Sequence, residues 1–405
     1  MGWNQYGQLG DGTYNSTNRP VQIVASGVTA IAAGYGHSLF LKSDGSLWAM
    51  GRNDFGQLGD GTYITTNRPV RIVGGIKAIA AGYAHSLFLK SDGSLWGMGY
   101  NLEGQLGNGT FKNASRPRLI VSGGVKTIAA GDSSLFLKNN GSLWAMGYNV
   151  NGMLGDGTYN NVNQPKQIVA AGVVAVAAGD HSMFVKSDGS LWVMGWNLSG
   201  QLGDGTYQNA KRPERIVSSG VKSIATGYYH SLFIKRDGSL WSMGENYFGG
   251  LGDGTDNNTN QPEQIVASGV TAIAGGSGHS LFLKNDGSLW AMGANGDGEL
   301  GDGVSGINQV THPEQIVPLV NTPTGNTNVN LVSISLAGTN LVFNGINGVS
   351  GTTNYLLMSA DATLPGNQWT SIATNILRTS DNFTFTVTNA MNLNTPQGFY
   401  ILQSP

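Results

Sequence analysis

Short apolar segments alternate with glycine-rich polar turns along most of this 405-residue chain. In one unit the apolar segments are Val28–Gly34, His37–Lys42, Ser46–Gly51 and Arg68–Val73. Segments of this length bounded by turn residues predict β-strands, and glycine interrupts every stretch long enough for a helix. Leu39, Phe40 and Leu41 are consecutive, so both faces of that strand are apolar, as in a sheet packed between two others. The pattern predicts an all-β fold with four strands in each unit.

The unit is repeated along the chain. A Gly-Asp-Gly turn recurs every 48 or 49 residues, with Asn108 in place of aspartate in the third copy. The aspartates are Asp11, Asp60, Asp156, Asp204, Asp253 and Asp302. A period of this size built from short strands is typical of a β-propeller, in which each repeat supplies one four-stranded blade.

The repeat resembles that of the regulator of chromosome condensation family. The shared pattern is Trp-Gly-x-Asn-x-x-Gly-Gln-Leu-Gly, then Pro-x-x-Val, then Val-x-x-Ile-Ala-x-Gly-x-x-His-Ser, and it covers about residues 1–317. The resemblance implies a seven-bladed propeller. Members of that family include a Ran exchange factor, a plant ultraviolet photoreceptor and a bacterial β-lactamase inhibitor, so the resemblance implies a fold without fixing a function.

The number of strands does not match the number of turns. Seven turn loops are present but only six strand triplets, each marked by one tryptophan: Trp48, Trp96, Trp144, Trp192, Trp241 and Trp290. Met1 aligns with Met50, and Val21–Val24 is interpreted as the fourth strand of a further blade. We therefore expect a seven-bladed ring truncated at its N-terminus, with six complete blades and a partial one, whose signal peptide is lost with the missing piece. The alternative is a six-bladed ring in which residues 1–27 are a loose or gap-filling segment.

The repeat stops near residue 317. Residues 318–328 have the composition of a linker, and residues 329–405 contain short strands spaced by turns, which predicts a small β-sandwich. This last segment resembles the C-terminal modules of secreted proteins of environmental bacteria, through Tyr355, Trp369–Asn375, Phe383–Thr386 and Pro396–Gln403. The predicted organisation is a propeller over 1–317, a linker over 318–328 and a β-sandwich over 329–405.

Composition narrows the function. Only 11% of the residues are charged and the formal net charge is -2, which argues against nucleic-acid or anionic-membrane partners. The chain has no cysteine, which excludes disulfides and thiolate metal sites, and no apolar run reaches the length of a membrane helix. Together with the C-terminal resemblance, this composition favours a bacterial protein located outside the cell or at its surface, and we expect a monomer.

Polar residues at fixed repeat positions are interpreted as structural. Aspartate in the Gly-Asp-Gly turn closes the turn by bonding its own backbone. One histidine precedes the second strand of five units, and Ser133 replaces it in the third; the five are His37, His85, His181, His230 and His279. Rings spread around a circumference cannot converge on one ion, so we expect each imidazole to bond a neighbouring turn and each strand tryptophan to pack between blades. No metal and no cofactor is predicted.

Residues that vary between repeats are the better candidates for function. In an up-and-down blade, the loop between the first and second strands and the loop between the third and fourth strands emerge on one face, here called the loop face. Aromatic enrichment marks protein interfaces, and aromatic rings also stack on sugars. We therefore predict a binding or scaffold propeller for a protein or a glycan, using Tyr35, Arg52, Tyr83, Tyr100, Glu103, Asp132, Tyr148, Asp180, Trp196, Tyr228, Tyr229, Glu245 and Tyr247.

Catalysis is the alternative function. Glu245, Asp297 and Glu299 lie on loops of adjacent units and could supply the two carboxylates of a polysaccharide-active enzyme. No standard catalytic motif accompanies them. Guanine-nucleotide exchange is a more remote alternative, because the chain has no basic chromatin-binding tail.

Overall fold

The computed structural model divides into two units, Met1–Val317 and Pro318–Pro405. It describes residues 1–316 and, in the second unit, residues 330–337, 340–346, 353–359, 370–376, 383–387 and 399–403. Every regular element of these residues is a β-strand, and none of them forms a helix that could cross a membrane. The predicted all-β class is confirmed.

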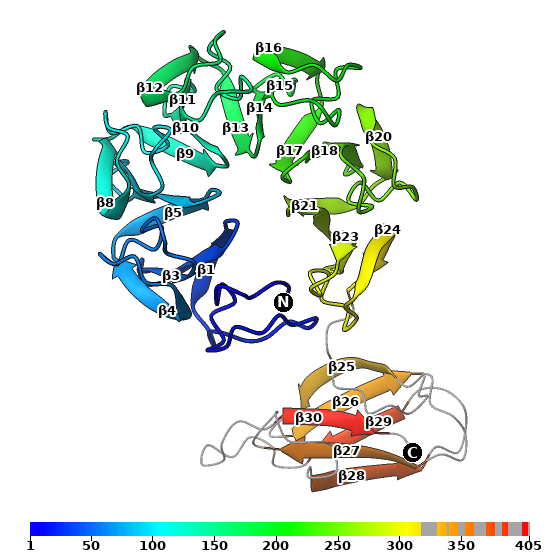
Figure 1. Cartoon of the computed structure of the whole chain (residues 1–405). Coiled ribbons are helices and arrows are strands. Elements are labelled where there is room, and N and C mark those ends of the chain that lie inside the picture. The colour runs from blue at the N-terminus through cyan, green and yellow to red at the C-terminus, as the bar shows by residue number, and fades with distance from the viewer. Residues whose placement is uncertain are drawn as a thin grey trace. The chain divides into compact units, whose positions relative to one another are not determined.

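Six four-stranded antiparallel sheets form the blades of the first unit (Figure 1). The first three blades are β1 (Val28–Ala33), β2 (His37–Lys42), β3 (Leu47–Gly51) and β4 (Thr66–Val73); β5 (Ile76–Ala81), β6 (His85–Lys90), β7 (Leu95–Gly99) and β8 (Ala114–Val121); and β9 (Val125–Ala130), β10 (Ser133–Lys138), β11 (Leu143–Gly147) and β12 (Val162–Val169). The last three are β13 (Val173–Ala178), β14 (His181–Lys186), β15 (Leu191–Gly195) and β16 (Ala210–Val217); β17 (Val221–Thr226), β18 (His230–Lys235), β19 (Leu240–Gly244) and β20 (Thr259–Val266); and β21 (Val270–Gly275), β22 (His279–Lys284), β23 (Leu289–Asn295) and β24 (Ile307–Gln315). The prediction of six complete propeller blades is confirmed.

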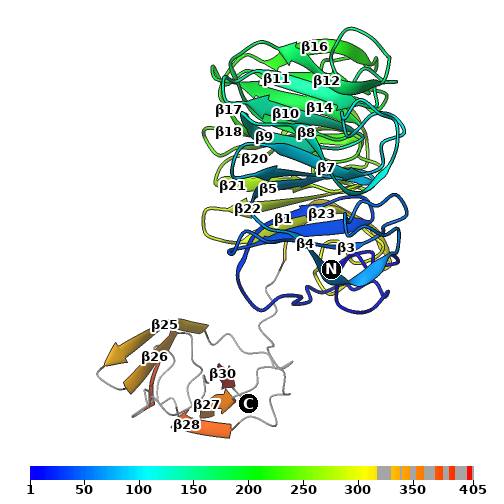
Figure 2. The ribbon, with the colours of Figure 1, turned by 90° about the vertical axis from the view of Figure 1, so that its left-hand side faces the viewer.

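Each blade runs from the centre of the ring to its rim. The first strand of a blade lies innermost and the fourth outermost in Figure 1, and Figure 2 shows the same ring from the side. The third strand ends on a glycine that no other residue could replace. At Gly51 the φ angle is 104°, and a Cβ atom would lie 2.5 Å from the carbonyl oxygen of Gly36. This close approach fixes where the chain leaves the sheet and enters the loop face.

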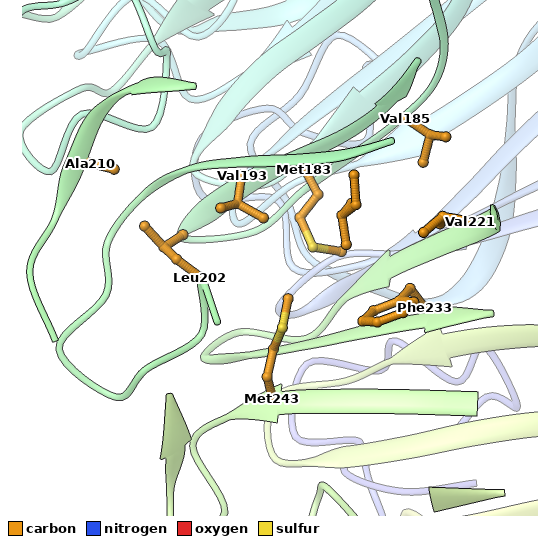
Figure 3. Close-up of a cluster of buried hydrophobic side chains, with 9 residues drawn as sticks. Met183, Val185, Val193, Leu202, Ala210, Val221, Phe233 and Met243 are labelled. Atoms are coloured by element: carbon orange, nitrogen blue, oxygen red, sulfur yellow. The ribbon is translucent and has the colours of Figure 1, made fainter. Parts of the chain in front are cut away.

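The hydrophobic core lies between blades rather than inside one sheet. Successive strand residues point to opposite faces, so each apolar strand packs against both neighbouring blades. Between the fourth and fifth blades, for example, Met183, Leu202 and Phe233 are fully buried together (Figure 3). Trp96 packs against the cluster between the first and second blades. Trp144, Trp192, Trp241 and Trp290 pack against the corresponding clusters, which confirms the expectation for these five tryptophans; Trp48, next to residues 1–27, belongs to none of these clusters.

Residues 1–27 lie between the sixth and first blades (Figure 1). The amide of Asn18 donates to the carbonyl of Gly303 at 2.8 Å on one side, and the backbone N–H of Gly12 donates to Asn67 at 2.9 Å on the other. A bridge joins Gly2 to Thr17, but no strand forms at Val21–Val24. The interpretation of Val21–Val24 as a strand is wrong, because the described residues supply no third strand beside it to complete the ladder.

The second unit contains two three-stranded sheets. One pairs β25 (Asn330–Ala337) with β26 (Asn340–Ile346) and β29 (Phe383–Val387); the other pairs β28 (Thr370–Ile376) with β27 (Thr353–Ser359) and β30 (Phe399–Gln403). The predicted linker over 318–328 lies outside the described residues. The sandwich arrangement stays a prediction.

Candidate binding face

A buried asparagine holds the shape of each loop on the loop face. Asn53 is fully buried; its side-chain oxygen accepts from the N–H of Leu58, and its amide donates to Asp60, to Thr62 and to the carbonyl of Ile64. Asp60 in turn accepts from the N–H of Thr62 at 2.9 Å. The bond from the leucine N–H recurs around Asn4, Asn101, Asn149, Asn197, Asn246 and Asn295. The interpretation of the Gly-Asp-Gly aspartates as turn residues is confirmed.

The repeated histidines connect one blade to the next. His37 Nε2 lies 2.9 Å from the hydroxyl of Ser86 in the following blade, and Ser86 donates to the carbonyl of Gln57. His85, His181 and His230 reach Ser134, Ser231 and Ser280 in the same way. We expected a turn as the partner, and that detail is wrong: the strand serine of the next blade lies nearer. Burial lowers the pKa of His37 to about 4, so the ring is neutral at pH 7.

The junction between the third and fourth blades lacks this connection. Ser133 stands where the other blades have histidine, and the hydroxyls of Ser133 and Ser182 are both fully buried with no hydrogen-bond partner among the described residues. A side-chain carbon at Gly82 would meet the His85 ring at 2.5 Å, whereas at Gly131 the three nearest atoms all belong to the backbone of Gly179. This junction therefore lacks the imidazole that the others contain and has two buried hydroxyls without a partner among the described residues.

A continuous chain of aromatic rings crosses the loop face above these junctions. Consecutive centroids are 5.3 Å apart from Tyr6 to Trp3, 5.7 Å from Trp3 to Tyr35 and 4.8 Å from Tyr35 to Tyr83. The chain continues over 6.4 Å to Tyr228, 4.6 Å to Tyr229 and 4.5 Å to Trp196. Tyr35 and Tyr83 are exposed and the others are half-buried. Rings of both loop types meet here, which confirms that the two sets of loops share one face.

A pocket of about 300 Å³ opens beside this chain. Its lining comes from three consecutive blades: Phe55, Tyr83, Ala84, His85, Tyr100, Glu103, Gln105, Asp132 and Tyr148. Phe55 and Tyr100 make an edge-to-face contact at 5.0 Å. Burial, followed by the nearby carboxylates, raises the pKa of Tyr100 and of Tyr148, so both phenols stay neutral and can donate a hydrogen bond at pH 7.

Two carboxyl groups lie together at the edge of the pocket. Asp132 and Asp180 precede Ser133 and His181 in adjacent blades, and their carboxyls are within hydrogen-bonding reach of each other. Asp180 is 8% exposed, and its Oδ1 atom has no partner among the described residues. Burial raises the pKa of both carboxyls, and the charge of Asp132 raises that of Asp180 further. At neutral pH the pair therefore holds a proton.

The carboxyl pair affects the phenols around it. Burial raises the pKa of Tyr229 to about 12, with Asp180 as the next cause. The pKa of Tyr228 is raised further still, mainly by burial and then by Asp132 and Asp180. The ion pairs formed by the described residues are Arg52 with Asp54 and Lys166 with Asp156. The acid pair is thus surrounded by neutral donors and has no cation of its own within the described part of the chain.

The remaining predicted residues have different surroundings. Arg52 lies over the rings of Tyr6 and Phe55, at 5.0 and 5.4 Å, and pairs with Asp54 at 2.7 Å. Glu103 accepts a hydrogen bond from Asn161 of the next blade. Glu245 is half-buried beside Ser199, and burial raises its pKa. Tyr247 is 70% exposed and contacts the Phe248 ring at 5.0 Å, apart from the aromatic chain.

The residues of the enzyme alternative are not assembled into one site. Glu299 occupies the loop position that glutamine holds in Gln8 and Gln57, and its carboxylate accepts from the N–H of Asp297 as those amides do from their loops. Asp297 is exposed and accepts from Ser16. Among the described residues, no hydrogen bond or ion pair joins Glu245 to either. This arrangement does not favour a pair of catalytic carboxylates.

Sequence reasoning missed the part of the site that lies below the surface. Trp3, Tyr6 and Phe55 were recognisable as aromatic loop residues, but their place in one chain of rings was not. The unpartnered hydroxyls of Ser133 and Ser182 were missed entirely. The available signal was the single replacement of histidine by Ser133, which falls next to Asp132, the first acidic residue at that loop position.

These features define a β-propeller whose loops form an aromatic and acidic face on one side of the ring. The RCC1-like domain model matches residues 1–219 and 75–343, so the chain belongs to the RCC1-like domain family. No curated protein matches the sequence significantly.

Solved structures of this family are similar in fold. The crystal structure of human WBSCR16 is 25% identical over 78% of this chain and 92% of that one, with a TM-score of 0.70. Prp20p from Saccharomyces cerevisiae, described with its binding properties to Gsp1p and histones, is 22% identical over 82% of this chain and 87% of its own, with a TM-score of 0.70. Yeast RCC1 (Prp20) bound to Kap60 gives 21% identity, 82% and 85% coverage, and a TM-score of 0.68.

Proposed function

We propose that this protein binds another protein through its loop face and acts as a recognition or scaffold propeller. The observation that carries the proposal is the chain of seven aromatic rings from Tyr6 to Trp196, which crosses loops of several blades and ends beside a buried acid pair. Clustered tyrosine and tryptophan with few competing charges is the composition of interaction hot spots. The description of Prp20p as a protein that binds Gsp1p and histones supports the same class of function.

The opposite face offers no comparable surface. There the hairpins between second and third strands repeat one short structure, in which Asp92 accepts from the N–H of Ser94 at 2.8 Å and the Trp96 indole donates to the Ser94 hydroxyl. The same bonds form at Asp44, Asn140, Asp188, Asp237 and Asp286. A face of near-identical polar turns carries little information for recognising a partner, so it serves as the control surface.

The proposal is tested by selecting peptides from a displayed random library on the whole chain. Selected peptides should lose at least tenfold in affinity when Tyr83, Tyr100 and Trp196 are replaced by alanine, because the anchoring rings are lost. The matched control is Ser91→Ala with Ser187→Ala on the opposite face, which should leave affinity unchanged. Equal loss on both faces, or selection of glycans on an array without any peptide, would contradict the proposal.

A further inference from the structure

The junction of the third and fourth blades differs from the others in three respects at once. It lacks the histidine that connects neighbouring blades, it leaves the hydroxyls of Ser133 and Ser182 without a partner, and it carries the two acids Asp132 and Asp180. Oδ1 of Asp180, in a residue more than nine-tenths buried, is also unpartnered among the described residues. Buried polar atoms normally find partners, so this concentration of unused acceptors requires an explanation.

The acceptors match one kind of ligand. An ionised carboxylate can only accept hydrogen bonds, and a buried pair of carboxyl groups is stable only with a shared proton or with a positive charge close by. The rings of Tyr83, Tyr100 and Tyr148 line the same pocket as Asp132, and aromatic faces attract cations. The pocket volume of about 300 Å³ accommodates an alkyl chain that ends in a charged group.

We propose that the pocket lined by Asp132, Tyr83, Tyr100 and Tyr148, with Asp180 next to Asp132, binds a cationic side chain, lysine or arginine, presented by the protein partner. This inference rests on the proposed function for the identity of the partner, but the pocket itself can be tested with small cations. When the ammonium or guanidinium group enters, it takes the place of the proton that the acid pair holds. Binding should therefore release a proton to the solvent.

The experiment uses n-butylammonium and n-butylguanidinium as probes, with n-butanol as the neutral probe, against the whole chain at pH 7. At tenfold excess over the dissociation constant, a cation should raise the melting temperature by about 2 °C. Titration calorimetry in two buffers of different ionisation enthalpy should report proton release. The cation that gives the larger shift identifies lysine or arginine as the matching side chain.

The decisive variant is Asp132→Asn with Asp180→Asn. It should fold at least as well as the parent, because it removes two buried acids, yet lose both the melting shift and the proton release. The single variant Asp180→Asn should lose most of the proton release while retaining Asp132. Glu263→Gln, on the fourth strand of the fifth blade, is the matched control and should behave as the parent does.

The outcomes separate the two proposals. Three results would overturn the pocket assignment. They are a melting-temperature shift of equal size in the parent and in all variants, a shift of equal size with n-butanol, or no shift with either cation. The cations are tested up to 100-fold above the protein concentrations used in the peptide measurements. Cation binding without any selected peptide would leave the pocket in place and overturn the proposed function instead. The titratable groups around the pair are Tyr83, Tyr100, Glu103, Tyr148, Tyr228, Tyr229 and Glu245. Burial raises the pKa of Tyr100, Tyr148, Tyr228 and Tyr229, so these phenols stay neutral at pH 7 and release no proton.

Discussion

Two kinds of blade boundary occur in this ring: five closed boundaries between successive blades, and one position between the sixth and first blades that holds residues 1–27. Leu41 and Leu89 in the closed boundaries are 3% and 0% exposed, whereas Leu283 at the corresponding place in the sixth blade is 39% exposed. On the other side, Ile31 of the first blade is 80% exposed, although Ile79, its counterpart, is partly buried. The two kinds of boundary therefore carry the same apolar side chains, but those that face the open position are more exposed to solvent.

The loops behave differently from the strands at this position. Met1 lies against Gly301 as Met98 lies against Gly59, and the N–H of Gly12 reaches Asn67 as the N–H of Gly61 reaches Ser115. Asn4 forms the same internal bonds as Asn53. The loop network thus continues through the open position without the three strands that carry it elsewhere, which shows that loop shape and blade packing are specified by separate sets of residues.

Adding three strands at the open position should have the largest effect. A copy of residues 28–49 fused before Met1, so that Met1 takes the place of Met50, gives the open position a first, second and third strand. It should raise the melting temperature by about 5–10 °C, because each apolar side chain it buries contributes about 1.5–3 kcal/mol, partly offset by the entropy of ordering the added residues. Calorimetry measures the change.

The control for this fusion keeps its length and turns but replaces the strand leucines, phenylalanine and tryptophan by serine and threonine. It should give no gain. If the two fusions melt at the same temperature, the exposed faces do not accept a blade and the six-bladed alternative is favoured.

Equivalent leucines should differ in their contribution to stability. Leu89→Ala opens a cavity in a closed boundary and should lower the free energy of unfolding by about 3 kcal/mol. Leu283→Ala, at the open position, should lower the free energy of unfolding by less than about 1 kcal/mol, because this leucine is already partly hydrated. Chemical denaturation of both variants at equal pH tests the difference, and similar costs would mean that Leu283 is covered in solution.

Replacing a histidine should also lower the free energy of unfolding by different amounts at the two kinds of boundary, and this difference should be smaller than the one between the leucines. His230→Ser breaks the bond to Ser280 and should cost about 1–2 kcal/mol at pH 7. His279→Ser should cost less, since the imidazole of His279 forms no hydrogen bond to another described residue. Ser133→His should show the reverse sign, a gain, by giving Ser182 a partner.

The contribution of His230 to the free energy of unfolding depends on pH. Burial lowers the pKa of His230 from 6.5 to about 4. The contribution of the neutral ring to stability is therefore complete above pH 6.5 and disappears as the pH falls through about 4. Unfolding curves of parent and His230→Ser between pH 7 and 4 should converge, and a constant difference would show that the ring does not titrate as described.

The structural elements could be predicted from the sequence wherever the same structural requirement recurs in every repeat. Strand positions, the shared loop face and the turn role of Asp60 all follow from comparing repeats, because the same interaction must be satisfied in each copy. Val21–Val24 failed for the complementary reason: its sequence fits a strand, but a strand also needs a partner, and that partner is not a property of the segment itself.

The candidate site was predictable only as a set of residues. Tyr83, Asp132 and Tyr228 were selected because they vary between repeats, yet which of them touch depends on the curvature of the ring and on side-chain directions that no spacing encodes. Tyr247 shows the limit: it is a loop tyrosine, but it follows the buried asparagine, whereas Trp3 and Trp196 precede it, and it contacts Phe248 rather than the aromatic chain. The partnerless hydroxyls of Ser133 and Ser182 require coordinates to be seen at all.

The buried asparagine of each loop has a further consequence for how such a protein can change. Asn53 satisfies the backbone of its loop from inside, and Gln57 accepts from the N–H of Phe55, so the side chains of Arg52, Asp54 and Phe55 take no part in these bonds. Arg52, Asp54 and Phe55 can be exchanged as Tyr100, Leu102 and Glu103 have been in the next repeat, without loss of the fold. The loop face is therefore a set of positions whose side chains can be replaced independently of the fold. New binding specificity can be acquired by one substitution at a time while the ring stays the same.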